Sequence, residues 1–266
     1  MPDTPGGFIW YELMTPDPAG SKAFYDSVVG WDIDTQSAVP GDTEYRMIKR
    51  SDGGNAGGVL TLTDAMREHG ARPVWLGYLQ SGDVDATVAA TEAAGGKAMM
   101  PATDMPGVGR IAMVADPQGA PIYVMKPTPP EGTPADAKSD VFSVDQPQRV
   151  RWNELSTSDQ DSAIEFYTRT FGWTQEGSMP MGEMGDYKFI NHGGEMIGAV
   201  MRKSDAMPVS LWLYYIGVDD IDRAAGAVTD GGGQVTMGPH EIPGGEYALI
   251  GTDPQGATFG LVGPRK

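Results

Sequence analysis

Two glutamates stand at matched positions of a phrase that the chain contains twice. Residues 10–31 read WYELMTPDPAGSKAFYDSVVGW, and residues 152–173 read WNELSTSDQDSAIEFYTRTFGW. Glu12 and Glu154 each follow a Trp by two residues, so on an extended strand the indole and the carboxylate point to the same face. A carboxylate among apolar groups must be hydrogen-bonded, paired or protonated, and it can serve as acid, base or acceptor. Glu12 and Glu154 are therefore candidate catalytic or ligand-binding residues, with a structural hydrogen bond as the alternative.

The repeat extends over nearly the whole chain. Glu12, the pair Phe24–Tyr25 and the pair Gly30–Trp31 all recur 142 residues later, as does Tyr45, which matches Tyr187. Further along, the motif DPQGA at 116–120 recurs at 253–257. So many identities in the same order indicate duplication. The stretch between the copies, PTPPEGTPADAKSDVFSVDQPQ, is rich in Pro and Asp and is typical of an extended linker.

Each half divides again into a strand, a helix and three more strands. FIWYELM alternates as a strand does, and Pro18–Val29 has a helical period that ends at Gly30. Asp83 can cap a second helix, and RIAMVA and PIYVM form a hairpin around DPQG. We expect an α+β fold of four βαβββ units, over about 8–63, 74–126, 150–203 and 210–263. The expected domains are 1–126 and 150–266, joined by a linker over 127–149.

Composition excludes several classes of protein. Only 19 Lys and Arg stand against 36 Asp and Glu, which argues against a nucleic-acid partner. Cys is absent, so disulfides and thiolate metal sites are impossible. Neither a signal peptide nor an apolar run long enough for a membrane helix is visible. The sequence predicts a cytoplasmic protein with no membrane association, either a monomer or a homodimer.

The paired βαβββ units, the phrase ending F-Y-x-x-x-x-G-W, the D-V-D that opens the second helix and the DPQGA motif together resemble the vicinal-oxygen-chelate superfamily. This group includes glyoxalase I, extradiol dioxygenases, and fosfomycin- and bleomycin-resistance proteins. The resemblance implies that units pair into two half-open β-sheet cups flanked by helices. It is specific for the fold rather than for the reaction.

Members of the superfamily that hold a metal bind it with His, Gln or Glu side chains of the cup. The matching positions in this chain are Trp10, Leu76 and Tyr123 in the first half, and Trp152, Leu213 and Gly260 in the second. None offers an oxygen or imidazole ligand of the usual kind. The three histidines, His69, His192 and His240, are expected in loops. We therefore predict no metal and no other cofactor.

Strand alternation assigns residues to the inner wall of each cup. The first wall receives Trp10, Glu12, Met14, Leu76, Tyr78, Ile111, Met113, Tyr123 and Met125. The second receives Trp152, Glu154, Ser156, Leu213, Tyr215, Ala248, Ile250, Gly260 and Val262. Both walls are apolar and aromatic around one carboxylate. Smaller residues, including Ser156 and Gly260, predict the roomier cup in the second half, which is the preferred ligand site. Pairing of the first unit with the fourth would mix the two walls.

Three functions fit these residues. The first is metal-independent binding of a small apolar or aromatic molecule, including a cationic one. The second is a metal-dependent lyase, isomerase or dioxygenase of the glyoxalase type. A metal-free lyase or isomerase that uses Glu12 or Glu154 as its base is intermediate between these two functions. The third is a regulatory protein-interaction module whose cups are filled. Whether the protein is an enzyme stays open at this point.

Overall fold

The protein is described by a computed structural model covering residues 5–39, 44–129, 132–134 and 137–266. Part of the expected linker, 127–149, falls outside these residues. The first half contains β1 (Phe8–Thr15), α1 (Pro18–Val29), β2 (Asp32–Ile33), β3 (Tyr45–Lys49), β4 (Asn55–Thr61), α2 (Asp64–Glu68), β5 (Val74–Gln80), α3 (Val84–Ala93), β6 (Lys97–Met105), β7 (Gly109–Ala115) and β8 (Pro121–Pro127). The second half contains β9 (Val150–Thr157), α4 (Gln160–Phe171), β10 (Thr174–Pro180), the short 3-10 helix η1 (Gly182–Met184), β11 (Asp186–His192), β12 (Glu195–Arg202), β13 (Leu211–Gly217), α5 (Ile221–Asp230), β14 (Gln234–Glu241), β15 (Tyr247–Thr252) and β16 (Thr258–Gly263).

The strands form two eight-stranded mixed sheets. Their orders are β2-β3-β4-β1-β5-β8-β7-β6 and β10-β11-β12-β9-β13-β16-β15-β14. Each sheet joins two consecutive βαβββ units through its central strands, β1 and β5 or β9 and β13. The predicted α+β fold of four βαβββ units is confirmed, and the units share sheets as first with second and third with fourth.

Helix boundaries follow from the local sequence. Asp17 and Asp159 accept backbone N–H groups at the starts of α1 and α4, while Gly30 and Gly172 end these helices in the left-handed conformation. Asp83 caps α3 as predicted. Helix α3 ends at Ala93, with Ala94 as its C-cap, just before the pair Gly95–Gly96.

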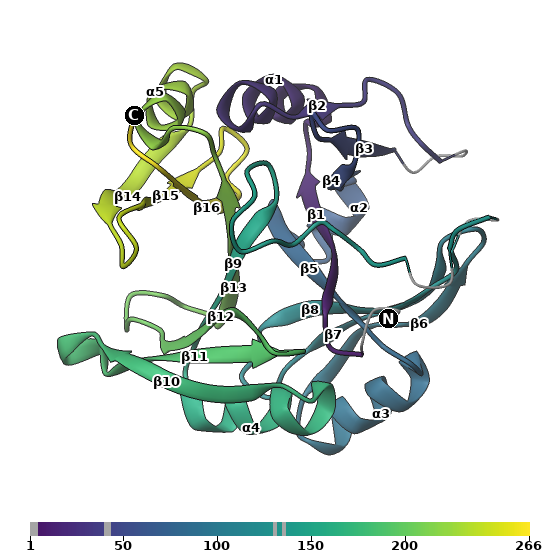
Figure 1. Ribbon diagram of the computed structural model, residues 1–266. Helices are drawn as coiled ribbons and strands as arrows, with labels where there is room; N and C mark the ends of the chain where they lie inside the picture. The colour runs from purple at the N-terminus through teal and green to yellow at the C-terminus, as the bar shows by residue number, and fades with distance from the viewer. Residues whose placement is uncertain (1–4, 40–43, 130–131, 135–136) are drawn as a thin grey trace. The chain divides into compact units, whose positions relative to one another are not determined.

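By backbone contacts the chain divides into two compact bodies that interleave the halves. Body 1 contains Gly77–Ser139 and Asn153–Trp212 with the chain up to Ile9; body 2 contains Trp10–Leu76, Asp140–Trp152 and Leu213–Lys266. In body 1 helices α3 and α4 are neighbours, and in body 2 helices α1 and α5 are neighbours (Figure 1). Units from different halves are therefore joined through their helices, while units of the same half share a sheet.

The repeated motifs meet in the core of body 2. The Tyr25 hydroxyl of α1 donates to Asp253 Oδ2 at 3.0 Å and accepts from the Trp75 indole at 2.9 Å. Asp253 Oδ1 accepts the backbone N–H groups of Gln255 and Ala257, which shapes the DPQGA turn. Burial raises the pKa of Asp253 above its ordinary value, against the opposing effect of these hydrogen bonds.

Body 1 repeats this arrangement with the other copy of each motif. Tyr167 donates to Asp116 Oδ2 at 3.2 Å and accepts from the Trp212 indole at 3.0 Å. Burial also raises the pKa of Asp116. In each body, the tyrosine of a Phe-Tyr pair is therefore hydrogen-bonded to the aspartate of the DPQGA motif from the opposite half. This contact gives a reason why both motifs occur in both halves.

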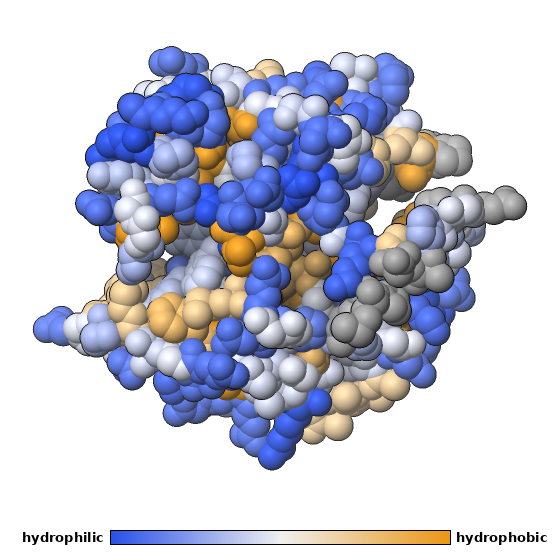
Figure 2. All heavy atoms as spheres, viewed as in Figure 1, coloured by the Kyte–Doolittle hydropathy of each residue, from blue (hydrophilic) through white to orange (hydrophobic). Residues whose placement is uncertain are grey.

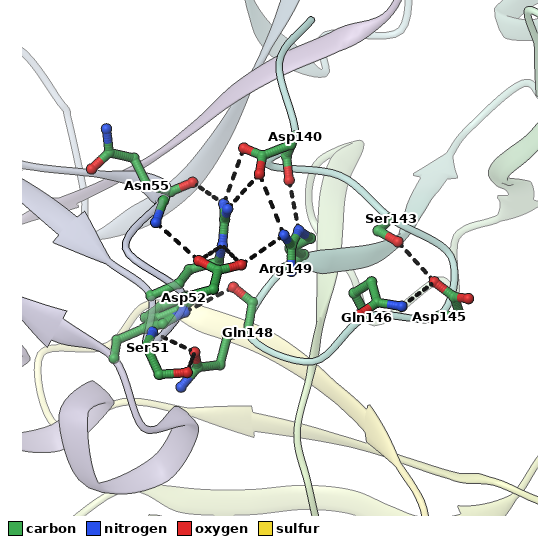
Figure 3. Close-up of polar contacts among 12 residues, drawn as sticks. Ser51, Asp52, Asn55, Asp140, Ser143, Asp145, Gln146, Gln148 and Arg149 are labelled. Carbon is green, nitrogen blue, oxygen red and sulfur yellow. Dashed lines mark hydrogen bonds and ion pairs between the residues drawn. The ribbon is translucent and has the colours of Figure 1, made fainter.

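The chain before β9 is anchored within body 2 by a network of charged groups (Figure 3). Arg50 follows β3, and its guanidinium bonds the carboxylate of Asp140, with Nη2 and Oδ2 2.5 Å apart. Arg149 reaches both Asp140 and Asp52. Because the Arg50 side chain is 1% exposed, these partners compensate for the burial of its charge.

Gln148 completes this attachment in an uncommon backbone conformation. Its φ of 61° makes it the one non-glycine residue in the described ranges with positive φ, and the matching position in the first half is Gly6. Its side chain accepts from the Ser51 N–H and hydroxyl, both at 2.8 Å, and donates to the Gly30 carbonyl. Its own carbonyl accepts from the Trp31 indole. These four bonds hold a conformation that would otherwise favour glycine.

Candidate ligand site

The positions that would hold the superfamily's metal carry unsuitable side chains. These are Trp10, Leu76, Tyr123, Trp152, Leu213 and Gly260, and across the described residues no three His, Asp or Glu side chains gather as a metal cluster would require. The residues present therefore do not fit a metal of the usual kind. The expectation that the histidines lie in loops is wrong for two of the three: His192 ends β11 and His240 lies in β14. His69 lies in the turn that follows α2, as expected.

Both candidate glutamates lie in the first strand of their half, as predicted. Glu12 in β1 pairs with Gly58 in β4, and Glu154 in β9 pairs with Ala199 in β12. Glu12 is 2% exposed and Glu154 is 8% exposed. Each carboxylate is thus held near the middle of a sheet, and the second one is the more accessible.

A tyrosine of the same sheet face holds Glu154 in body 1. Tyr187 in β11 donates its hydroxyl proton to Glu154 Oε2 at 2.7 Å. Because residues two apart on a strand share a face, Ser156 and Glu154 both lie on the side toward which Tyr187 reaches. A hydroxyl donated to a carboxylate stabilises its ionised form. The arrangement offers a hydrogen-bond acceptor whose position is fixed by Tyr187.

The matching tyrosine of the first half, Tyr45, lies in body 2. Tyr45 in β3 accepts a hydrogen bond from the Trp10 indole at 2.7 Å. Its phenol lies directly over Gly58, so that a methyl group added there would overlap the ring and its hydroxyl. The first half thus ties its tyrosine to the tryptophan that precedes Glu12.

Three aromatic and apolar wall residues of the first half line up across neighbouring strands of body 1. Tyr78 in β5 pairs with Tyr123 in β8, which pairs with Met113 in β7. The two tyrosine rings are stacked, with centroids 4.2 Å apart and planes at 17°. Both tyrosines are buried, so these predicted wall residues fill space close to one another.

The corresponding row of the second half lies in body 2. Tyr215 in β13 pairs with Gly260 in β16, which pairs with Ile250 in β15. The Tyr215 ring rests on the glycine backbone, where a Cβ would be 2.5 Å from its Cδ1. The second half has Gly260 at the position that Tyr123 occupies in the first half, so one aromatic ring is missing there. The Tyr215 ring takes the space next to this glycine.

The second wall is the less buried of the two. Leu213 and Tyr215 are partly exposed, whereas the matching Leu76 and Tyr78 are buried. Trp152 and Ile250 are partly exposed, as Trp10 and Met113 are in the first half. On the face shown in Figure 2, apolar residues gather over β11 and β12. Met184 in η1 and Met196 in β12 are each 40% exposed. These observations favour the second half as the place where a ligand reaches apolar surface.

Tyr45 and Tyr187 were not among the predicted site residues. Their match across the repeat was visible, but their strand is the third of its unit, and its register against the first strand cannot be read from the sequence. The repeated tyrosine was the available signal, because a polar group kept in both copies of an apolar face needs a partner there.

Comparison with known proteins identifies the family. The profile of the Glyoxalase/Bleomycin resistance protein/Dioxygenase superfamily matches residues 7–124 and again 149–261. The chain belongs to this superfamily and contains its domain twice.

Relatives match over almost the full length. A Mycobacterium tuberculosis protein named as a glyoxylase, CFP32, is 31% identical over 256 residues, covering 96% of this chain and 94% of the relative. The anthracycline biosynthesis protein DnrV of Streptomyces peucetius is 29% identical over 274 residues, covering 97% and 93%.

Among solved structures, the Mn(II)-bound glyoxalase from Novosphingobium aromaticivorans is similar with a TM-score of 0.62 and 18% identity, covering 99% of this chain and 83% of that one. The 2,3-dioxygenase LapB from Pseudomonas sp. KL28 also gives a TM-score of 0.62, at 14% identity, covering 99% and 92%. At these identities the likeness establishes the fold. None of the helices in the described part of the chain has the length and apolarity needed to cross a membrane.

Proposed function

We propose that the second half of this glyoxalase-superfamily protein binds a small apolar or aromatic molecule, without a metal, and that Glu154 anchors it. The observation that carries the proposal is the carboxylate of Glu154, placed on a sheet face and held by Tyr187 at 2.7 Å. A carboxylate held by Tyr187, whose ring packs against Phe189, suits a flat ligand that carries a hydroxyl or ammonium donor. The cytoplasmic location predicted from the sequence belongs to the same proposal.

The choice of the second half rests on exposure and on side-chain size. Glu154 and Ser156 are each 8% exposed, against 2% for Glu12 and 4% for Met14 at the matching positions. A serine in place of a methionine leaves more space next to the carboxylate. We therefore assign a structural role to the first half. Substitution of Glu12 then serves as the internal control for substitution of Glu154.

The names of relatives support an aromatic ligand or a glyoxalase-type substrate. DauV and DnrV are named for anthracycline biosynthesis, and CFP32 is named as a glyoxylase. Doxorubicin is a suitable probe, because it combines fused rings with an ammonium group and is itself fluorescent.

The test compares doxorubicin binding by the wild type, Glu154→Gln and Glu12→Gln, using fluorescence titration in chelator-treated buffer. Loss of a hydrogen bond to a charged group is worth about 1.5–3 kcal/mol, so Glu154→Gln should weaken binding by roughly 10- to 100-fold. Glu12→Gln should bind as the wild type does. Equal effects of the two substitutions, or binding only after metal addition, would contradict the proposal.

The same pair supports a second candidate, a metal-free lyase or isomerase in which Glu154 removes a proton next to a carbonyl group. The hydrogen bond from Tyr187 would hold the carboxylate at the reacting carbon. Proton NMR of the hemithioacetal of methylglyoxal and glutathione, with chelated protein, distinguishes this candidate from binding alone. Conversion that is lost in Glu154→Gln would establish catalysis, whereas unchanged substrate signals would leave the binding function.

The other two candidates have less support. A metal-dependent lyase or dioxygenase would need ligands that the six matching positions do not supply. A regulatory module with filled cups fits the buried, stacked Tyr78 and Tyr123 of the first half, but not the partly exposed wall of the second.

A further inference from the structure

The side chain of Gln148 fills a slot in body 2 (Figure 3). Its Oε1 accepts from the backbone N–H and the hydroxyl of Ser51, both at 2.8 Å, and its Nε2 donates to the carbonyl of Gly30. A Cβ built on Gly30 would stand 3.0 Å from Gln148 Nε2, so the carboxamide lies directly against this glycine. The slot therefore recognises both ends of a primary carboxamide, its oxygen through donors and its nitrogen through an acceptor.

The strands that border this slot recur in body 1. Asp32 in β2 pairs with Lys49 in β3. The residues 142 positions later, Thr174 in β10 and Asn191 in β11, form the same antiparallel pair. The frame around the slot is therefore present a second time.

Gly6 stands in body 1 where Gln148 stands in body 2. The carbonyls of both residues accept from a tryptophan indole, Gly6 from Trp173 at 2.7 Å and Gln148 from Trp31 at 2.9 Å. A Cβ built on Gly6 would overlap the backbone oxygen of Phe171, so this position has no room for a side chain. A residue at position 6 therefore cannot fill the second slot in the way that Gln148 fills the first.

The place of the carboxamide is an open recess in body 1. It has a volume of about 180 Å³, and its lining includes Gly172 and Gly193, which follow Gly30 and Ser51 by 142 residues. Apart from its chain neighbours, no atom of the described residues lies within 4 Å of a Cβ built on Gly172. The space that Gln148 takes beside Gly30 is therefore open beside Gly172.

A buried donor in the lining of this recess has no acceptor. The Nδ2 atom of Asn191 is buried and has no hydrogen-bond partner among the described residues. Such a donor costs free energy until an acceptor satisfies it. In body 2, the hydroxyl of Ser51 is the second donor to the carboxamide oxygen, and Gly193 lacks a hydroxyl. Asn191 is the residue of body 1 that can supply this second donor.

We propose that the recess is a binding site for a small molecule that carries a primary carboxamide. The ligand oxygen accepts from the Gly193 N–H and from Asn191 Nδ2, and the ligand nitrogen donates to the Gly172 carbonyl. The ligand thus takes in body 1 the place that the chain's own Gln148 takes in body 2. The recess shares no lining residue with the site at Glu154 and does not depend on the function proposed above.

The test is a titration of the full-length protein with propionamide, which is the side chain of glutamine as a free molecule, followed by amide NMR. A few hydrogen bonds of modest net strength predict a Kd of roughly 10–100 mM. The signals of Gly172 and Gly193 should shift saturably, and propionate, which lacks the N–H donor, should shift them less. Absence of saturable shifts, or equal shifts with propionate, would overturn the proposal.

A blocked variant locates the bound probe. Thr174 is exposed and lines the recess, so Thr174→Trp should fill it and remove the effect of propionamide. The next residue of a strand points to the other face, which makes Gln175→Trp the matched control, with shifts as in the wild type. Saturable shifts that survive in Thr174→Trp would place the probe elsewhere and overturn the assignment.

Gln148→Gly opens the slot of body 2 and tests whether its frame recognises a free carboxamide. The φ of 61° at this position suits glycine, so the backbone should keep its conformation. Propionamide should then shift the signals of Gly30 and Ser51, which it leaves unmoved in the wild type. Binding in the opened slot without binding at Gly193 would overturn the proposal. If this variant does not fold, the titration of the wild type decides by itself.

Discussion

Replacement of Tyr25 by phenylalanine should be strongly destabilising, although it removes a single oxygen atom. The hydroxyl is fully buried, donates to Asp253 Oδ2 at 3.0 Å and accepts from the Trp75 indole at 2.9 Å. Tyr25→Phe leaves both partners without this bond in a closed core. An unsatisfied buried group costs about 1–3 kcal/mol, which predicts a loss of roughly 2–6 kcal/mol for the two partners together.

The assay is denaturant unfolding followed by tryptophan fluorescence and circular dichroism, with Tyr167→Phe as the matched variant of body 1. Tyr167 has equivalent bonds to Asp116 and Trp212, so its loss should fall in the same range. A loss below about 1 kcal/mol in both variants would refute the idea that the repeated motifs fasten the halves through these tyrosines.

The pH dependence of the same contact has a definite sign. Burial raises the pKa of Asp253 above 3.8 in the folded state, so the folded protein binds this proton more tightly than the unfolded chain does. The stability contributed by protonated Asp253 is therefore fully present below about pH 3.8 and is lost as the pH rises through the folded-state value. Asp253→Asn should abolish this part of the pH dependence, and an unchanged slope would contradict the assignment.

Three further predictions concern the sheets, the charged network and metals. Gly260→Ala should lower the unfolding midpoint and displace the Tyr215 ring, because the new Cβ would stand 2.5 Å from Cδ1; a crystal structure with an unmoved ring would contradict this. Arg50→Met should cost about 1–3 kcal/mol in chemical denaturation, since the buried guanidinium joins β3 to Asp140, whereas Asp140→Asn, with a 61% exposed side chain, should cost less. Removal of metals with EDTA should change neither the melting temperature nor doxorubicin binding; a metal that stabilises the fold as a specific ligand does would contradict the metal-free site.

Much of the fold was predictable because duplication doubles every signal. The period of α1 and the glycine that ends it were visible, and α1 spans the predicted residues 18–29. The capping Asp17 was not identified from the sequence. Strands β2, β6, β10 and β14 were not identified individually, because they are short or mostly exposed and therefore lack a clear apolar alternation.

The candidate site was only partly predictable, for a physical reason. Alternation within one strand placed Glu12 and Glu154 correctly on β1 and β9, because period two is a local property. The partners of these glutamates depend on register between strands that are far apart in sequence. Tyr187 lies in β11, which is joined to β9 through β12, so its approach to Glu154 appears only in three dimensions.

The central claim is that the second half binds an aromatic ligand at Glu154 without a metal. A crystal structure of the protein with doxorubicin, with anomalous data collected to detect metals, tests it most directly. We expect the drug on the second half, with its ammonium or a hydroxyl group on the Glu154 carboxylate, Tyr187 still bonded to Oε2, and no anomalous peak at the site. A drug molecule bound at Glu12 instead, or a metal ion between ligand and protein, would contradict the account.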